Sequence, residues 1–282
     1  MDIKKIIQTL TPEEKVALLA GRDTWHMRGI ESAQLLPLLL TDGPHGIRKQ
    51  EYDVTFKQEV TKEATCFPTA SLTSCSWDKD VLKEMGNAIA QEASALAVDI
   101  VLGPGLNIKK SGFNGRNFEY VSEDPFLTGH LGASFIKAME KEGIMSCPKH
   151  FALNNYETRR MSTNVVVDQR ALREIYLKGF EIAIKEGKPS AIMTSYNRVN
   201  GTYATEHPQL LQDILRKEWK YKGLIMSDWG ATNNRLEALR ASMDLEMPGP
   251  NKEHERILLE ALENGSLSED ILDESIQRVI ET

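Results

Sequence analysis

Apolar runs of strand length alternate with amphipathic stretches of helix length along most of the chain. A capping box with proline at its first helical position, TPEE at residues 11–14, predicts the start of the first helix. Strands are predicted at 35–43, 99–108, 144–151, 190–197, 223–230 and 242–249, with a weaker candidate at 65–70. Further helices are predicted at 78–97, 129–142, from 168 onward, and at 208–219, 232–240, 253–263 and 269–281.

Uninterrupted apolar strands separated by amphipathic helices indicate a parallel sheet that is covered on its faces. The alternation repeats about seven times, which favours an α/β fold of the TIM-like (β/α)8 barrel type with one strand short or irregular. A doubly wound open sheet is the competing architecture, but no GxGxxG opens the first helix and polar residues end nearly every strand. The long loop at 109–125 is expected to carry functional residues.

Composition narrows the classes of function. The net charge is −7 and no basic run or arginine-rich stripe is present, so we expect no nucleic-acid partner. Residues 1–15 form no apolar signal segment and no run reaches membrane-spanning length, so we expect no membrane partner and a cytoplasmic location. Cys66, Cys75 and Cys147 are odd in number and widely spaced, which does not suit a disulfide framework or a CxxC metal site.

Polar and aromatic residues gather at the carboxyl ends of the predicted strands. In a barrel of parallel strands these ends form one face, and that face carries the active site. A single aspartate after a strand is more often a helix N-cap than a catalyst, but agreement among many strand ends weakens that interpretation. The segments concerned are Thr41–Gly43, Asn107 with its loop, Lys149–Phe151, Tyr196–Asn197, Ser227–Trp229 and Glu246–Pro248.

Two residues at these ends leave alternatives open. Asp228 either caps the helix that follows it or serves as a carboxylate nucleophile, with Trp229 as an aromatic wall that suits the C–H face of a sugar. His150 taken alone is better explained as a hydrogen-bonded core histidine than as a metal ligand, because no HxH or HExxH motif supplies further ligands. No GxxxxGK motif supports phosphate binding, so neither a metal nor a cofactor is expected. The remaining tryptophans, Trp25, Trp77 and Trp219, are interpreted as packing residues.

Five motifs at the strand ends occur in an order that resembles a known family. They are TDGPHGIR, GRNFEYVSEDPFLTG, CPKHFALNNYETRR, MTSYNRVNG and MSDWGA. Each motif alone is modest, but together they closely resemble the N-terminal barrel domain of glycoside hydrolase family 3, the β-glucosidase group. The resemblance runs from about Thr11 to the C-terminus and implies that residues 1–282 are this barrel domain.

The resemblance also implies a role for particular residues. Asp228 matches the catalytic nucleophile of these retaining enzymes, and Asp42 matches the carboxylate that holds the far hydroxyls of the terminal glucose. Tyr196 matches a tyrosine beside the nucleophile, and Trp229 matches an aromatic residue at the border of the pocket. The other residues that match sugar-binding positions are Arg116, Lys149, His150 and, more weakly, Arg160. Below these we place Glu119, Glu123 and Asp124 as loop-shaping residues that could pair with arginines.

A retaining glycosidase needs a nucleophile and a general acid/base about 5–5.5 Å apart. The nucleophile must be ionised, and we expect Lys149 and Arg116 to lower its pKa. In most members of the family the acid/base is a glutamate of a downstream α/β sandwich domain. The single-domain N-acetylhexosaminidase branch instead uses a histidine in a KHFPGHG-type loop, which this chain replaces with KHFALNN. We therefore expect a barrel without the sandwich domain.

Two functions follow from this expectation. The first is a retaining β-glucosidase barrel that acts on terminal β-D-glucosyl residues and is impaired because the glutamate is missing. The second is an isolated or engineered scaffold that folds, and that can bind sugar, without catalysis. In either case the partners expected are a small-molecule β-glucoside and, across the apolar surface that the absent domain would leave, a homodimer contact or that domain itself.

Overall fold

Parallel strands lie at the centre of the molecule in a computed structural model that describes residues 3–53 and 57–282. Strands β1 (Leu40–Asp42), β4 (Ile100–Leu102) and β5 (Met145–Ser146) form one parallel sheet, with Leu40 opposite Ile100 and Ile100 opposite Met145. Strands β7 (Ala191–Met193) and β10 (Leu224–Met226) form a second parallel pair. Side chains of successive residues on β4 enter different core clusters, so this sheet is buried on both faces.

Isolated parallel bridges extend this arrangement. Phe151 bridges Thr194, Met226 bridges Leu245, and Ala20 bridges Glu246. Among the described residues the named strands do not close into a barrel, because they fall into four small sheets. The structure therefore confirms the predicted α/β fold with parallel central strands. It does not confirm the predicted closed (β/α)8 barrel.

Two small sheets lie outside the parallel strands. Strands β2 (Gln50–Asp53) and β3 (Gln58–Thr61) pair in antiparallel fashion. Strand β8 (Arg198–Val199) lies between β6 (Asn164–Val165), with which it is parallel, and β9 (Thr202–Tyr203), with which it is antiparallel. The sequence analysis did not predict either sheet.

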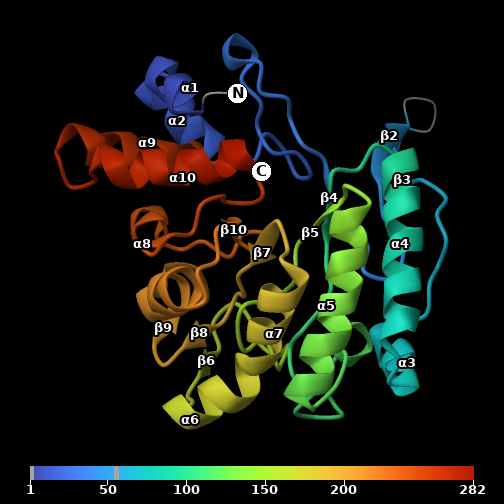
Figure 1. Ribbon diagram of the computed structural model, residues 1–282. Coiled ribbons are helices and arrows are strands. Elements are labelled where there is room, and N and C mark those ends of the chain that lie inside the picture. The colour runs from blue at the N-terminus through green and yellow to red at the C-terminus, as the bar shows by residue number, and fades with distance from the viewer. Residues whose placement is uncertain (1–2, 54–56) are drawn as a thin grey trace.

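The helices gather in two groups around the strands (Figure 1). Helices α4 (Lys79–Ala95), α5 (Pro125–Lys141) and α7 (Lys178–Gly187) pack side by side. A Cβ atom added at Gly129 would lie 2.6 Å from Cβ of Ile182, so glycine at this position allows the close approach of α5 and α7. The second group joins the two ends of the chain and consists of α1 (Ile3–Thr9), α2 (Pro12–Leu18), α9 (Lys252–Glu263) and α10 (Glu269–Glu281).

The remaining helical segments are short or have an irregular hydrogen-bond pattern. The α-helical ones are α3 (Ala70–Thr73), α6 (Gln169–Ala171) and α8 (Arg235–Arg240). The segments η4 (Leu172–Tyr176) and η6 (Gln209–Glu218) are π-helical, and single 3-10 turns occur at η1 (Glu31–Ala33), η2 (Ser74–Ser76), η3 (Asn117–Glu119) and η5 (Ala204–Glu206).

Helix starts follow the capping signals in the sequence. Thr11 and Glu14 form the predicted capping box of α2, and Asp168 caps α6, where the sequence predicted a helix to open. Asp124 caps α5 by accepting a hydrogen bond from Leu127 N. Helix α5 begins at Pro125, four residues before its predicted start, because proline at this position suits the first helical turn.

Every predicted strand is longer than the strand observed or is absent, and three predictions differ most from the structure. Residues 65–70 form no strand, since Phe67 N binds the carbonyl of His45 and Ala70 already starts α3. The run at 35–43 is a strand only from Leu40, and Leu36 is 81% exposed. The predicted last strand at 242–249 is reduced to single bridges at Leu245 and Glu246.

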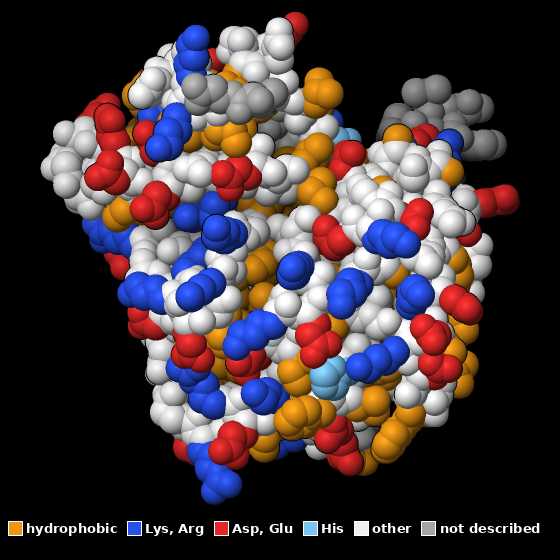
Figure 2. Space-filling model, in the orientation of Figure 1, with side chains coloured by type: hydrophobic (Ala, Val, Ile, Leu, Met, Phe, Trp, Pro, Cys, Tyr) orange, Lys and Arg blue, Asp and Glu red, His pale blue; other side chains and the backbone are white. Residues whose placement is uncertain are grey.

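The surface carries acidic and basic side chains intermixed on the face shown in Figure 2. None of the helices in the described ranges is long and apolar enough to cross a membrane.

Candidate active site

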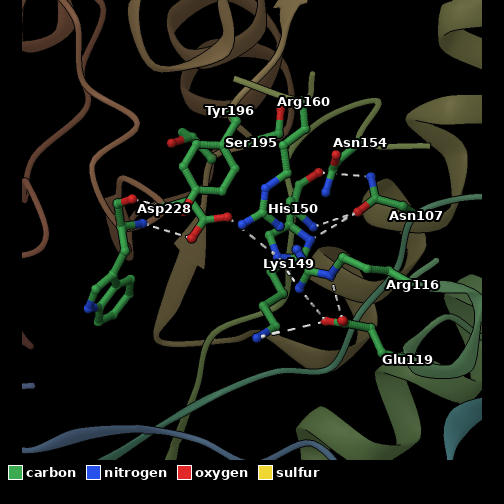
Figure 3. Close-up of polar contacts among 12 residues, drawn as sticks. Asn107, Arg116, Glu119, Lys149, His150, Asn154, Arg160, Ser195, Tyr196 and Asp228 are labelled. Atoms are coloured by element: carbon green, nitrogen blue, oxygen red, sulfur yellow. Dashed lines mark hydrogen bonds and ion pairs between the residues drawn. The ribbon is translucent and has the colours of Figure 1, made fainter. Parts of the chain in front are cut away.

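The ends of the parallel strands bring most of the predicted site residues together (Figure 3). Asp228 follows β10, Tyr196 follows β7, and Lys149 and His150 follow β5. Arg116 lies in the long loop after β4, which confirms that this loop contributes to the cluster. Arg160 comes from the segment between β5 and β6, and its side chain also points to the cluster. This set of residues is called the Asp228 cluster below.

Asp228 is a buried carboxylate with an incomplete set of hydrogen bonds. The residue is 8% exposed, and its Oδ1 accepts a hydrogen bond of 2.7 Å from the backbone N–H of Trp229. Its Oδ2 is buried and has no hydrogen-bond partner among the residues that the structure describes. A buried acceptor without a donor costs about 1–3 kcal/mol, so its presence in the folded chain calls for an explanation.

Burial raises the pKa of Asp228 above its ordinary value, and this effect exceeds the opposing effects of its surroundings. The positive charges of Lys149, Arg116 and Arg160 and the Trp229 N–H each lower the pKa. The sequence analysis correctly predicted that Lys149 and Arg116 lower the pKa of Asp228. It did not predict that desolvation raises this pKa by a larger amount. The three cations therefore offset part of the effect of burial on the Asp228 pKa.

His150 is held as a neutral imidazole in a fixed orientation. Desolvation, followed by the charges of Arg116, Lys149 and Arg160, lowers its pKa well below the ordinary value. Nη2 of Arg116 can only donate, and it lies 3.0 Å from Nε2 of His150, so Nε2 accepts and Nδ1 carries the proton. His150 Nε2 therefore cannot donate to Asp228 Oδ2, 3.6 Å away, which explains why that oxygen lacks a donor.

Two residues that the sequence analysis did not assign to the site fix the other side of His150. Nδ1 lies 3.1 Å from the hydroxyl of Tyr120 and 3.3 Å from Oδ1 of Asn107. Asn107 also pairs with the backbone of His150, accepting from its N–H at 2.8 Å and donating to its carbonyl at 2.9 Å. Asn154 donates to the Tyr120 hydroxyl at 3.4 Å. Asn107 could have been identified from its position at the end of a predicted strand. Tyr120 and Asn154 lie inside the quoted motifs, but nothing in the sequence around them marks them as site residues.

Lys149 links two carboxylates at the edge of the cluster. Its Nζ lies 3.2 Å from Oδ1 of Asp42, at the end of β1, and 3.9 Å from Oε1 of Glu119. Glu119 accepts two hydrogen bonds from Arg116, of 2.7 and 2.8 Å, which is the paired geometry expected of an ionised carboxylate. The Asp42 side chain is 40% exposed, and its Oδ2 lies 3.5 Å from Arg48. Asp42 is thus the accessible carboxylate of the group.

Tyr196 and Arg160 lie against each other. The Arg160 guanidinium stands 4.5 Å above the centre of the Tyr196 ring, and it also donates to Glu157 at 3.0 Å. The Tyr196 hydroxyl donates to the carbonyl of Trp229 at 2.8 Å. Burial and the nearby Asp228 charge raise the pKa of Tyr196, so the hydroxyl keeps its proton.

Trp229 is half-buried and belongs to an aromatic pair. Its ring centre lies 5.5 Å from that of Trp25, and its Nε1 donates to the carbonyl of Thr24 at 2.8 Å. Trp25 therefore supports the aromatic residue next to Asp228. The packing interpretation is confirmed for Trp219, which is buried, and is wrong for Trp77, which is 77% exposed.

One predicted strand end does not join the cluster. Glu246 turns toward α8 and α9, where its carboxylate accepts from His254 at 2.8 Å and Asn251 at 3.1 Å and lies 3.8 Å from Arg235. Asp124 caps α5 instead of pairing with an arginine, whereas the expected pairing is found for Glu119.

Nothing in the described part of the chain forms a metal centre, since no group of three or more His, Cys, Asp and Glu side chains is suitably placed. Both ring nitrogens of His150 already have protein partners. Chemically, the cluster combines a buried carboxylate that has an unpartnered oxygen with three cations, and the accessible carboxylate of Asp42 lies beside it. Such a site suits a neutral ligand rich in hydroxyl groups.

Comparison with known proteins finds glycoside hydrolases that are similar to this chain over nearly its whole length. Residues 52–282 match the family described as the glycosyl hydrolase family 3 N terminal domain. The thermostable β-glucosidase B of Acetivibrio thermocellus is 45% identical over 99% of this chain, and the β-glucosidase B of Emericella nidulans is also 45% identical over 99%. An exo-α-(1→6)-L-arabinopyranosidase of Bifidobacterium longum is 40% identical over 98%. The chain spans 37%, 32% and 36% of the lengths of these relatives.

Solved structures agree with this assignment. β-Glucosidase 3B of Thermotoga neapolitana in complex with glucose superposes with a TM-score of 0.93 at 38% identity, covering 100% of this chain and 42% of that one. The β-glucosidase of Kluyveromyces marxianus in complex with glucose gives a TM-score of 0.94 at 36% identity and is covered to 33%. The family match, the identities and the superpositions together show that this chain belongs to glycosyl hydrolase family 3, in the N-terminal domain of that family.

Proposed function

We propose that this chain is the N-terminal barrel-type domain of a retaining β-glucosidase, with Asp228 as its nucleophile. The observation that carries the proposal is the buried Oδ2 of Asp228, which has no hydrogen-bond donor although it lies among three cations. An oxygen that is free of donors is available to attack carbon. The fold class supports this placement, because polar side chains at the carboxyl ends of parallel strands form the active face of (β/α)8-type folds.

In the proposed reaction Oδ2 of Asp228 forms a bond to the anomeric carbon while the bond from that carbon to the leaving oxygen breaks. The leaving oxygen takes a proton from a general acid. Water then attacks the anomeric carbon of the glycosyl-enzyme, gives a proton to the conjugate base of that acid, and releases Asp228 as a carboxylate. The β-configuration of the sugar is retained because the carbon is inverted twice.

We propose that Asp42, Arg116, Lys149 and His150 bind the ring hydroxyls. Asp42 is accessible and can accept from two hydroxyls, while Lys149 can donate to one of them. His150 would accept at Nε2 if Arg116 turned toward the sugar, since Arg116 Nη2 occupies that atom in the structure. Arg160 and Tyr196 would border the ring, and Trp229, supported by Trp25, would face the leaving group.

The general acid is proposed to lie outside this domain. The two carboxylates beside the cluster, Asp42 and Glu119, already bind cations, and Glu119 is fully engaged by Arg116. A carboxylate in such a pair is poorly suited to carry the proton that a leaving alcohol needs. The isolated chain should therefore hydrolyse only substrates whose leaving group departs without protonation.

Steady-state hydrolysis of 4-nitrophenyl β-D-glucoside by the wild-type chain and by Asp228→Ala tests the proposal. The variant should lose activity by about 10⁴-fold or down to background, as expected for removal of a nucleophile. Asp213→Ala removes an exposed carboxylate on η6 and is the matched control, which should keep its rate. Equal rates in the wild type and Asp228→Ala would instead favour a scaffold that folds without catalysis.

Methyl β-D-glucoside in the same assay tests the missing acid. General acid catalysis contributes roughly 10²–10⁴-fold to the departure of a poor leaving group. Without it, the aryl glucoside should be hydrolysed faster than the methyl glucoside by a factor larger than the difference in their intrinsic reactivities. The arabinopyranosidase relative supports a second substrate. 4-Nitrophenyl α-L-arabinopyranoside should therefore be included, and a higher kcat/KM for it would assign the pentopyranoside as the substrate.

A further inference from the structure

A pocket of about 300 Å³ lies apart from the Asp228 cluster. Loop residues that follow β4 and β5 line it, together with residues next to β6 and β7. This volume is at the lower end of the range typical of small-molecule sites. None of the residues of the Asp228 cluster belongs to its lining, whose main members are Lys110, Leu153, Asn155, Tyr156, Tyr176 and Asn197.

Asn197 gives this pocket a buried acceptor without a donor. The residue is 2% exposed, and its amide nitrogen donates to two carbonyls, those of Ala152 at 3.3 Å and Arg198 at 3.2 Å. Turning the amide over would set its oxygen against both carbonyls, so the orientation of the side chain is fixed. The buried Oδ1 of Asn197 has no partner among the described residues, so a donor on a ligand would satisfy it.

Asn155 supplies a second acceptor of the same kind. Its amide nitrogen donates to the carbonyl of Ile108, and its buried Oδ1 has no partner. Both asparagines line the pocket, so two residues of its wall carry a buried amide oxygen that lacks a donor. A ligand with at least two hydroxyl groups would satisfy both.

The walls add apolar surface and little charge. Tyr156 is 53% exposed and Tyr176 is half-buried, and the rest of the wall includes the aliphatic side chain of Leu153. Among the described residues that line the pocket there is no carboxylate, and Lys110 is the one charged residue. A pyranose ring has hydroxyl donors at its edge and C–H groups on its face. It therefore matches a pocket with amide acceptors on one side and an aromatic side chain on the other.

We propose that this pocket is a second carbohydrate site, which binds a neutral pyranose ring such as D-glucose. Consecutive residues serve the two sites: Asn154 bonds to Tyr120 beside His150 while Asn155 lines the pocket, and Tyr196 contacts Arg160 while Asn197 lines the pocket. The proposal goes beyond the catalytic role of Asp228 and does not require it.

Titration of ¹⁵N-labelled protein with D-glucose, observed at the side-chain amides of Asn155 and Asn197, tests this site directly. Both signals should shift and saturate in the wild type, and they should do so with a similar midpoint in Asp228→Ala, which alters only the other site. Absence of a saturable shift overturns the proposal. Loss of the shifts in Asp228→Ala also overturns it, because the shifts would then be transmitted from the Asp228 cluster.

Tyr156→Ala removes a half-exposed wall and should raise the glucose concentration at the midpoint by about tenfold. Phe126→Ala is the matched control, since Phe126 is 55% exposed on α5 and does not line the pocket. An unchanged midpoint in Tyr156→Ala contradicts the site. Independently of any variant, wild-type crystals soaked in D-glucose should show a sugar ring against Tyr156, whereas ordered water alone in the pocket would refute the proposal.

Discussion

Asp244 and Asp228 are both buried, but their carboxylates differ in the number of hydrogen bonds that they accept. Asp244 is completely buried and accepts from Arg216 at 2.6 Å, Arg278 at 2.8 Å, Ser275 at 2.6 Å and Ile225 N at 2.9 Å. Asp228 has one donor, Trp229 N, and an oxygen without any. The difference separates a carboxylate that joins η6 and α10 to the strands from one whose second oxygen has no donor among the described residues.

Replacing Asp244 should have the largest effect on stability. Asp244→Asn would leave Arg216 and Arg278 as mostly buried charges without their counter-ion, and breaking such a pair costs roughly 3–5 kcal/mol. Urea unfolding measures the loss. Asp213→Asn, an exposed aspartate paired with Lys217, should change the midpoint little. A small loss in Asp244→Asn would mean that the two aspartates do not differ in the way described.

Lys149→Met should reduce kcat/KM on the aryl glucoside by about 10²-fold, because it removes a charged hydrogen bond to the sugar and a cation that stabilises the Asp228 anion. Without that cation the pKa of Asp228 rises further. The acidic limb of the pH–rate profile should therefore move to higher pH. Lys185→Met, an exposed lysine on α7, is the control. A lower rate with an unmoved acidic limb would show that Lys149 acts on the substrate alone.

Asp228→Asn should stabilise the fold at neutral pH by about 1 kcal/mol, because it removes a buried charge whose Oδ2 lacks a donor. The pKa of Asp228 is raised in the folded state, so the carboxylate destabilises the fold increasingly as the pH rises through that pKa. The gain should therefore be present at neutral pH and vanish in acid, where the carboxyl is protonated in both states. Thermal unfolding at two pH values measures it, and a destabilised Asn variant at neutral pH would contradict the assignment.

Tyr120→Phe should have the smallest effect. The hydroxyl lies 3.1 Å from Nδ1 of His150, but Oδ1 of Asn107 is also within 3.3 Å and can still accept the ring proton. We expect kcat/KM to fall less than about tenfold, which corresponds to one neutral hydrogen bond. Asn107→Leu in the Tyr120→Phe background removes both acceptors and should lower the rate more than the two single changes combined. Additive effects would show that the orientation of His150 does not depend on these partners.

The sequence predicted features that follow from local rules. Helices α4, α9 and α10 show strong amphipathic patterns, and Asp228, Lys149 and Tyr196 lie shortly after the ends of β10, β5 and β7. The β2–β3 hairpin was missed because its strand β3 is mostly exposed and lacks an apolar run. The segment at 65–70 was mistaken for a strand because its backbone N–H groups at Phe67 and Ala70 bond to His45, a distant partner that no local pattern reveals.

Hydrogen-bond partners from distant segments were beyond prediction from the sequence. The pKa direction of Asp228 depends on how deeply the folded chain buries it, and the orientation of His150 depends on Tyr120 and Asn107, which lie 30 and 43 residues away. Glu246 follows the same kind of strand end as Asp228, yet it turns to α9 because His254 and Asn251 provide donors there.

The central claim is that Oδ2 of Asp228 attacks the anomeric carbon. Incubation of the wild-type chain with 2,4-dinitrophenyl 2-deoxy-2-fluoro-β-D-glucoside, followed by peptide mass spectrometry, tests it most directly. The account predicts one fluoroglucosyl group per chain, attached to Asp228. Labelling of Asp42 or Glu119 instead, or turnover of an aryl glucoside with no label on Asp228, would contradict it.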